Sequence, residues 1–389
     1  MKHTLLMASA LLALATLLPA QNKSAGIHLS LWKKVGTQRI DTLQTTYFNL
    51  GFQSTMNRLN GVGVNILPGA VHKNMNGLQF SAIANLVGGS MHGVQLSGIS
   101  NINGNNLVGI SATGLINIAG NNVQGLLCSG LMNIAGDNTR GVVAGGLMNI
   151  TGNEGSGMQL AGIANIAGSN FNGLMSSGLL NVVGSTLNGI QLSGLGNITA
   201  DRMNGAQIGL LNYATKVNGV QFGLVNYYKS ELKGVQLGLV NVNPNTKVQL
   251  MVFGGNATKT NVAARFKNRL FYTLVGGGTH YLSFGDKFSA ALFYRGGIWL
   301  PLYKKLVISG DLGYQHIETF HNKSADIPAR LYALQARINL EVPLTKKLAV
   351  FASGGYGLSR HYNKNATYDR GMIIEAGLIV SNFKANSSK

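Results

Sequence analysis

The sequence predicts an all-β protein in which an antiparallel meander closes as one large β-barrel. Three observations predict it: a Gly- and Asn-rich motif that recurs every 16 residues, apolar and polar side chains that alternate along most segments, and turn-forming residues between the segments. Glycine accounts for 53 of the 389 residues, a density that would destabilise helices. We expect roughly 18 to 24 strands in the barrel.

The repeat is defined by two residue types in fixed register. Its glycines are Gly61, Gly77, Gly93, Gly109, Gly125, Gly141, Gly157, Gly173, Gly189 and Gly205, followed by shorter steps to Gly219 and Gly234. Its asparagines include Asn85, Asn101, Asn117, Asn133, Asn149, Asn165, Asn181 and Asn197. In the copy from Gly189, Ile190 and Leu192 alternate with Gln191 and Ser193. A period of two predicts strands, joined by turns such as the Gly-Asn-Asn at 120–122.

Two architectures can be built from this unit. In a meander, neighbouring copies run antiparallel, and the motif favours this because it is nearly palindromic, with Gln and Asn at mirrored positions. In a β-solenoid, each copy is one coil and identical residues stack. The solenoid is favoured because residues 61–204 contain only Phe80 and Phe171 as aromatics, whereas membrane strands carry aromatic girdles. We expect the meander, with a solenoid followed by a smaller C-terminal barrel as the alternative.

The N-terminus is typical of an exported protein. Lys2 and His3 precede an apolar run from Leu5 to Leu18, and Ala20 offers a cleavage site before Gln21. We therefore expect residues 1–20 to be a signal peptide. No second run of 18 apolar residues follows, so a membrane-spanning version of this chain must cross with strands.

The remaining chain divides into three predicted regions. Residues 21–60 are expected to form N-terminal strands, and Asn49 stands where the Asn of a degenerate copy beginning near Asp41 would fall. Residues 61–247 are the repeats, and residues 248–389 are predicted to be aromatic-rich barrel strands, because 23 of the 29 aromatic residues follow residue 204.

The C-terminal region has the alternation of an outer-membrane barrel. Alternating runs cover 269–283, 288–302, 306–320, 329–344, 348–362 and 370–383. Short and long connections alternate between these runs, as they do in outer-membrane barrels. The phase of these runs directs a set of charged side chains into the lumen, where we expect them to neutralise one another: Arg295, Asp311, Arg337, Glu341 and Glu375.

The charge distribution argues against nucleic acid as a partner. The formal net charge is +19, but residues 77–204 hold two basic and three acidic groups, whereas residues 247–389 hold 19 basic and seven acidic ones. The basic residues mostly flank apolar strands, which places them in turns near water or lipid headgroups. The partners we expect are outer-membrane lipid and the machinery that assembles such barrels.

The sequence indicates no enzyme and no cofactor. It contains no zinc-protease, paired-cysteine, serine-hydrolase or P-loop motif. Cys128 is the single cysteine and is expected to be a small apolar filler. His316, His321 and Glu318 lie close together in sequence, but their place at a strand end favours a solvated rim over a metal site. The Asn and Gln columns are expected to hydrogen-bond to one another.

Two late copies, GVQFGLVN from Gly219 and GVQLGLVN from Gly234, carry a resemblance. The chain resembles the Gly-x-Gln-x-Gly-Leu-x-Asn surface-repeat proteins of Gram-negative bacteria over roughly residues 61–256. The 16-residue copies differ by an additional small residue before the central Gly. The resemblance implies a cell-surface repeat protein without an established molecular function.

These observations lead to two hypotheses about function. The first is an outer-membrane protein with a structural role or the role of a passive pore. The alternative is a surface adhesin, which displays a repeat solenoid to an extracellular ligand such as a glycan or a host molecule.

Overall fold

The computed structural model describes residues 26–33, 35–38, 44–280, 282–283, 287–303, 306–322, 330–362 and 368–383. The regular structure of these residues consists of β-strands, which confirms the all-β class. The chain forms two compact units, Met1–Val220 and Gln221–Lys389. The predicted signal peptide at residues 1–20 lies outside the described residues.

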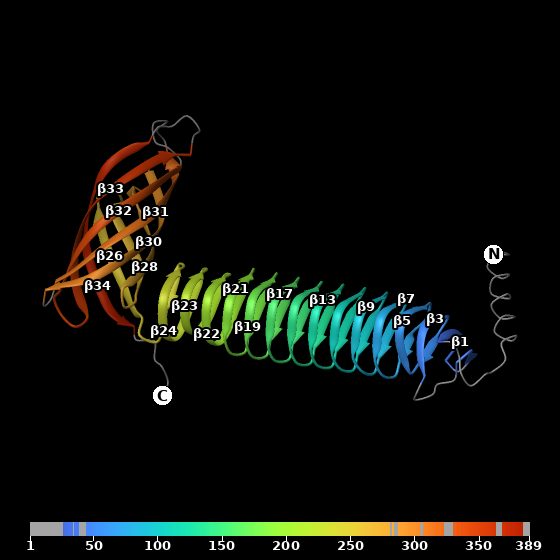
Figure 1. The fold of residues 1–389 in the computed structure, drawn as a ribbon. Coiled ribbons are helices and arrows are strands. Elements are labelled where there is room, and N and C mark those ends of the chain that lie inside the picture. The colour runs from blue at the N-terminus through green and yellow to red at the C-terminus, as the bar shows by residue number, and fades with distance from the viewer. Residues whose placement is uncertain are drawn as a thin grey trace. The chain divides into compact units, whose positions relative to one another are not determined.

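The repeats form a parallel β-solenoid (Figure 1). Each coil contains one seven-residue strand, such as β11 (Leu107–Thr113), and one four-residue strand, such as β12 (Ile116–Ala119). Each strand pairs in parallel with the same strand of the next coil, so that Gly109 is opposite Gly125 and Asn101 is opposite Asn117. The expected meander of the repeats, closing as one barrel of roughly 18 to 24 strands, is therefore wrong. The alternative of a solenoid with a smaller C-terminal barrel is confirmed.

The long strands stack along one side of the solenoid and the short strands along another. The long strands are β3 (Thr45–Gly51), β5 (Arg58–Asn65), β7 (Met75–Ser81), β9 (Met91–Ser97), β11, β13 (Val123–Ser129), β15 (Thr139–Gly145), β17 (Gly155–Ala161), β19 (Phe171–Ser177) and β21 (Leu187–Ser193). The short strands are β4 (Ser54–Met56), β6 (Gly69–Val71), β8 (Ala84–Val87), β10 (Ser100–Asn103), β12, β14 (Met132–Ala135), β16 (Met148–Thr151), β18 (Ala164–Ala167) and β20 (Leu180–Val183).

The physical reason for the parallel arrangement is visible in the interior. Parallel coils stack each Asn on an Asn and each Gln on a Gln, and one amide can donate to the next along the column. Asn85 donates to Asn101 Oδ1 at 2.9 Å, and Gln95 donates to Gln79 Oε1 at 3.1 Å. A continuous apolar row lies beside these columns, and Met75, Met91 and Leu107 are fully buried in it.

From the copy that begins at Gly189 onward, short and long strands merge into single bent strands. These are β22 (Gly196–Ile208), β23 (Leu211–Phe222) and β24 (Val225–Leu237), and β25 (Val240–Val242) follows them. The first part of β22 pairs with β20 and its second part pairs with β21. Loss of the Gly-Asn-Asn turn thus lets one strand continue around the corner of the coil.

The N-terminal coil is covered by a small hairpin. Strand β1 (Ile27–Trp32) pairs in parallel with β3 and antiparallel with β2 (Val35–Gly36). Asn49 lies on the long strand β3, opposite Gly63 of the next coil, in the column that holds Gln79 two coils further on. It is therefore not in the Asn column that the sequence suggested, although its Nδ2 donates to Asn65 Oδ1 at 2.9 Å.

The C-terminal unit contains a closed antiparallel barrel of eight strands (Figure 1). They are β26 (Lys247–Gly255), β27 (Thr260–Lys267), β28 (Phe271–Thr279), β30 (Lys287–Tyr303), β31 (Leu306–Asn322), β32 (Arg330–Pro343), β33 (Leu348–His361) and β34 (Asp369–Phe383). Strand β26 pairs with β34, and this pairing closes the barrel. The two-residue strand β29 (Leu282–Ser283) pairs with the start of β30. The alternating runs of the sequence correspond to six of these strands.

Candidate functional site

The interior of the barrel is the first candidate site, because it gathers charged side chains out of water. The five residues predicted to face the lumen are all buried there: Arg295, Asp311, Arg337, Glu341 and Glu375. Arg265 and Lys267 of β27 join them and were missed by the sequence analysis. Their signal was the alternation of Val262, Ala264 and Phe266 with Arg265 and Lys267, in a run too short to stand out.

One group of charges is centred on Glu341. Its carboxylate accepts hydrogen bonds from Nη1 and Nη2 of Arg265, at 2.6 and 2.9 Å. The Lys267 ammonium lies 3.5 Å from the same carboxylate. The Lys267 Nζ also lies over the Trp299 ring, 4.0 Å from the ring centre. These contacts replace the water that each charge loses, which is the condition for burying ions at all.

A second group is centred on Glu375. Arg295 binds its two carboxylate oxygens at 2.8 and 3.0 Å, and Arg337 Nε lies 3.1 Å from the same carboxylate. Asp311 lies beside Arg337 and accepts a hydrogen bond from the Tyr272 hydroxyl at 2.7 Å. The five expected lumen charges are therefore brought together into paired groups.

These groups fill the lumen. An eight-stranded barrel has a narrow interior that side chains alone can fill. Apolar rings pack against the ion pairs, and Phe253 and Phe293 lie 5.0 and 4.9 Å from the Arg295 guanidinium. The interior thus has the character of a packed core, with arginines cross-linking strands on opposite walls of the barrel.

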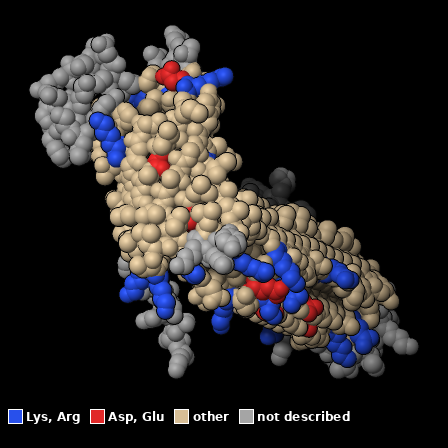
Figure 2. Space-filling model, turned by 90° about the vertical axis from the view of Figure 1, so that its left-hand side faces the viewer, with Lys and Arg blue, Asp and Glu red and all other residues tan. Residues whose placement is uncertain are grey.

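The outer wall of the barrel has the opposite character. Large aliphatic side chains project from it, among them Leu312 at 72%, Ile338 at 62% and Met372 at 76% exposure. On the face shown in Figure 2, the barrel wall carries few Lys, Arg, Asp or Glu, and most of those visible lie towards its two ends. An apolar outside around a polar inside is the arrangement that suits a barrel surrounded by lipid.

The solenoid places its repeat residues in two structural columns. The glycines Gly77, Gly93, Gly109 and Gly125 stack in one column with positive φ, and a Cβ added to Gly109 would lie 2.0 Å from the Gly93 carbonyl oxygen. The asparagines Asn85, Asn101, Asn117 and Asn133 are buried in the other column. Asn117, for example, donates to Asn133 Oδ1 at 2.9 Å and to the Cys128 carbonyl at 2.6 Å.

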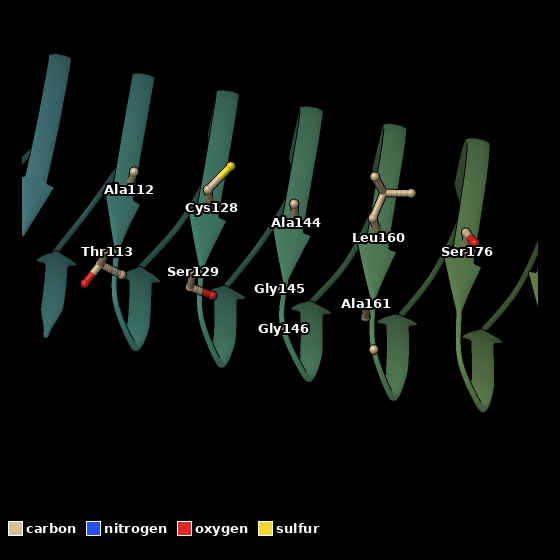
Figure 3. Close-up of a pocket in the computed structure, with 11 residues that line it drawn as sticks. Ala112, Thr113, Cys128, Ser129, Ala144, Gly145, Gly146, Leu160, Ala161 and Ser176 are labelled. Atoms are coloured by element: carbon tan, nitrogen blue, oxygen red, sulfur yellow. The ribbon is translucent and has the colours of Figure 1, made fainter. Parts of the chain in front are cut away.

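A shallow hollow of about 550 Å³ crosses several coils on the outside of the solenoid (Figure 3). Small side chains create it, because Ala112, Cys128, Ala144 and Ser176 take places that Phe80 and Leu96 fill in earlier coils. Cys128 is half-buried, and burial raises the pKa of its thiol. The thiol is therefore less reactive than a free cysteine side chain.

The histidines near Glu318 do not form a metal centre with the described residues. His316 Nε2 lies 3.3 Å from the Glu318 carboxylate, which also accepts a hydrogen bond from Arg330 Nε at 3.0 Å. The His321 side chain lies outside what the structure describes. Among the described residues, no group of three or more His, Cys, Asp or Glu side chains could hold a metal ion. No described helix is long and apolar enough to span a membrane.

Fold and sites together define the chain as a parallel β-solenoid followed by an eight-stranded antiparallel barrel. No protein-family model matches the chain. No curated protein matches it either. Among solved structures, it is similar to the crystal structure of Neisserial surface protein A (NspA), with 10% sequence identity and a TM-score of 0.24. The match covers 35% of this chain and 93% of that one.

Proposed function

We propose that this is an outer-membrane protein in which the barrel is a sealed anchor and the solenoid is a structural element held on the periplasmic side. The observation that carries the proposal is the eight-stranded barrel itself, which is apolar outside and ion-paired inside. In lipid, a closed barrel satisfies every backbone hydrogen bond without water. The exposed aliphatic side chains of its wall lose contact with water on insertion, which stabilises the inserted state.

The filled lumen favours an anchor over a passive pore. Arg265 and Glu341 connect β27 to β32, and Arg295 and Glu375 connect β30 to β34, so that bidentate ion pairs cross the lumen. An ion passing through would have to separate these buried pairs, and leaving one buried charge without its partner costs about 3 to 5 kcal/mol. We expect purified protein to give no steady conductance in planar bilayers. Stable open channels would contradict the anchor role.

The connections between strands favour a periplasmic solenoid. At the end where β26 begins and β34 ends, three residues separate Lys267 from Phe271 and two separate Tyr303 from Leu306. At the opposite end, seven residues separate Asn322 from Arg330, and seven separate His361 from Asp369. Outer-membrane barrels have short turns on the periplasmic side and longer loops on the outside. Asn268 lies in one of the short turns. Its Nδ2 donates a hydrogen bond to the Asn241 carbonyl at 2.9 Å, and its Oδ1 accepts one from Asn243 Nδ2 at 2.8 Å. The last coil is thereby held at the short-turn end.

In the proposed orientation, this barrel could not display the solenoid outside the cell. The chain would have to pass from the outer side to the start of β26 through the lumen, which the paired charges of Glu341 and Glu375 occupy. The topology therefore favours a structural role over the adhesin alternative. The hydrogen-bonded Asn columns suit that role, because they tie every coil to the next.

Cysteine labelling of whole cells tests the membrane orientation. In a Cys128→Ser background, Asn121→Cys places a thiol on an exposed turn of the solenoid, and Lys259→Cys places one in the 256–259 connection at the long-loop end. We expect a membrane-impermeant maleimide to label Lys259→Cys on intact cells and to label Asn121→Cys only after permeabilisation. The reverse pattern would overturn the proposed orientation and support display.

A separate measurement tests the membrane anchor. We expect the protein to remain in the membrane fraction after urea washing and to show different gel mobility in heated and unheated samples. Release by urea, without a mobility shift, would contradict the barrel anchor whatever the labelling shows.

A further inference from the structure

Four tyrosines form a cluster on the outside of the barrel at its long-loop end. We call Tyr314, Tyr332, Tyr362 and Tyr368, together with His316, the tyrosine rim. Tyr362 is 52% and Tyr368 is 50% exposed, so the rim is a surface feature and not part of the core. It lies over strands β31 to β34 and the residues next to them.

The rim is held together by its own contacts. The Tyr314 and Tyr362 hydroxyls lie 3.0 Å apart, and the Tyr332 and Tyr368 hydroxyls lie 3.3 Å apart. The Tyr332 and Tyr362 rings meet edge to face with centroids 5.3 Å apart. His316 Nδ1 lies 3.1 Å from the Tyr362 hydroxyl. Such mutual contacts fix the hydroxyls in place, so little conformational entropy is lost when they bind a ligand.

Two arginines stand among these rings. The Arg360 guanidinium lies 5.2 Å from the centre of the Tyr368 ring. Arg370 is exposed on the neighbouring strand, where its register partner is Leu358, two residues before Arg360 on the same face. Diagonal neighbours of this kind lie about 7 to 8 Å apart, close enough for both side chains to reach one anion. Arg330, also on the rim, is balanced by Glu318 at 3.0 Å.

We propose that the tyrosine rim, with Arg360 and Arg370, binds the phosphate-bearing headgroup of an outer-leaflet lipid. This inference rests on the proposed membrane function and orientation. Guanidinium groups bind phosphate in pairs of parallel hydrogen bonds. Tyrosine suits the boundary between acyl chains and headgroups, because its ring is apolar and its hydroxyl is polar.

The surroundings of the rim identify the ligand as a lipid and not as a soluble anion. On the same outer face, next to the rim on the side towards the short-turn end, lie Leu334, at 53% exposure, and Met372, at 76%. Leu312, at 72%, lies below Tyr314 on β31. A molecule that placed its phosphate at the two arginines would lay its apolar part along these side chains. Inorganic phosphate would gain nothing from that contact.

The test uses the full chain in detergent micelles, titrated with bisphosphorylated lipid A and, separately, with the same lipid after dephosphorylation. Bound lipid is counted by native mass spectrometry. We expect the phosphorylated form to bind more tightly, and the double variant Arg360→Gln, Arg370→Gln to bind it about tenfold or more weakly, since hydrogen bonds to charged groups are the strong ones. The matched control is Arg330→Gln, which removes the same charge from the same rim but from a residue already paired with Glu318.

Three results would overturn this inference: equal binding of both lipid forms, unchanged binding by the double variant, or equal loss in the Arg330→Gln control. Displacement of the lipid by millimolar inorganic phosphate would also overturn it, by assigning the site to a free anion. These outcomes are distinct from failure of the membrane function, because each requires protein that has inserted and shows heat-dependent gel mobility.

Discussion

The buried Asn column gives the sharpest prediction, through the variant Asn117→Asp. Asn117 Oδ1 accepts from Asn101 at 3.2 Å, and an aspartate would keep that role. Its Nδ2 donates to Asn133 Oδ1 and to the Cys128 carbonyl, and an aspartate would set oxygen against oxygen at both places. The change is nearly isosteric, so its effect reports the hydrogen bonds and the burial of a carboxyl group, not the packing.

The magnitude follows from the two lost donations. A buried polar group left without its partner costs about 1 to 3 kcal/mol, so two such losses amount to roughly 2 to 6 kcal/mol. The cost falls on the coils next to Asn117, because each coil of a solenoid touches only its neighbours. Hydrogen exchange of the full-length protein, followed by mass spectrometry, measures the opening free energy of those coils directly.

The solenoid contains its own control in the exposed turn column. Asn122 Nδ2 donates to Asn106 Oδ1 at 3.0 Å, with the same spacing along the chain but in contact with water. We expect Asn122→Asp to change the opening free energy by less than about 1 kcal/mol, because water replaces the lost partner. If both variants exchanged at the same rate, the Asn column would not be what holds the coils in register, and the reasoning would be refuted.

Three further variants or conditions test other parts of the structure. Gly109→Ala puts a Cβ 2.0 Å from the Gly93 carbonyl at a φ of +128°, and we expect a loss of about 3 kcal/mol or more in opening free energy by hydrogen exchange. Glu341→Gln leaves the buried Arg265 uncompensated, and we expect a loss of about 3 to 5 kcal/mol in barrel stability, measured by urea titration of the gel-mobility shift. His28 is buried, which lowers its pKa from 6.5 to about 4. The unfolded coil therefore takes up a proton first as the pH falls, and stability is lost between about pH 6.5 and 4. At pH 5 the N-terminal coil should open more easily by roughly 2 kcal/mol, at ~1.36 kcal/mol per unit between 6.5 and 5.

Each of these predictions has a matched control. An added Cβ at Gly354 meets nothing within 4 Å, so Gly354→Ala should leave stability unchanged. Glu318→Gln removes a carboxylate from the outer rim, where water can take its place, and should shift the urea midpoint little. In a His28→Gln variant the acid sensitivity of the first coil should disappear. If it remains, another group is responsible.

The inner and outer faces of the barrel strands were predictable from the sequence, because polar and apolar residues alternate along each strand. Leu334 and Ile338 alternate with Gln335, Arg337 and Asn339, and the structure places the first set outside and the second inside. A single strand suffices to assign such a phase. The partners of each charge were not predictable, since Arg265 and Glu341 are distant in sequence and meet only when the barrel closes.

The solenoid was harder to predict, because its repeat fits two pairings. The near-palindrome pointed to antiparallel neighbours with Gln opposite Asn, yet Gln79 stacks on Gln95 and Asn85 on Asn101. Alternation along one strand does not reveal the direction of the next. The repeat glycines were the decisive signal. Gly77 and the equivalent glycines of the later coils all have positive φ, and stacking them in one column requires a glycine at the same place in every coil.

In-register stacking also makes the length of the solenoid a discrete variable. Removal of residues 109–124 would leave Asn101 opposite Asn133 and every other column intact, and would shorten the stack by about 4.8 Å, the spacing of neighbouring strands. Removal of half a coil would instead put turns against strands. Gain or loss of whole copies therefore offers a route by which the reach of this protein can change in small equal steps while its anchor stays the same.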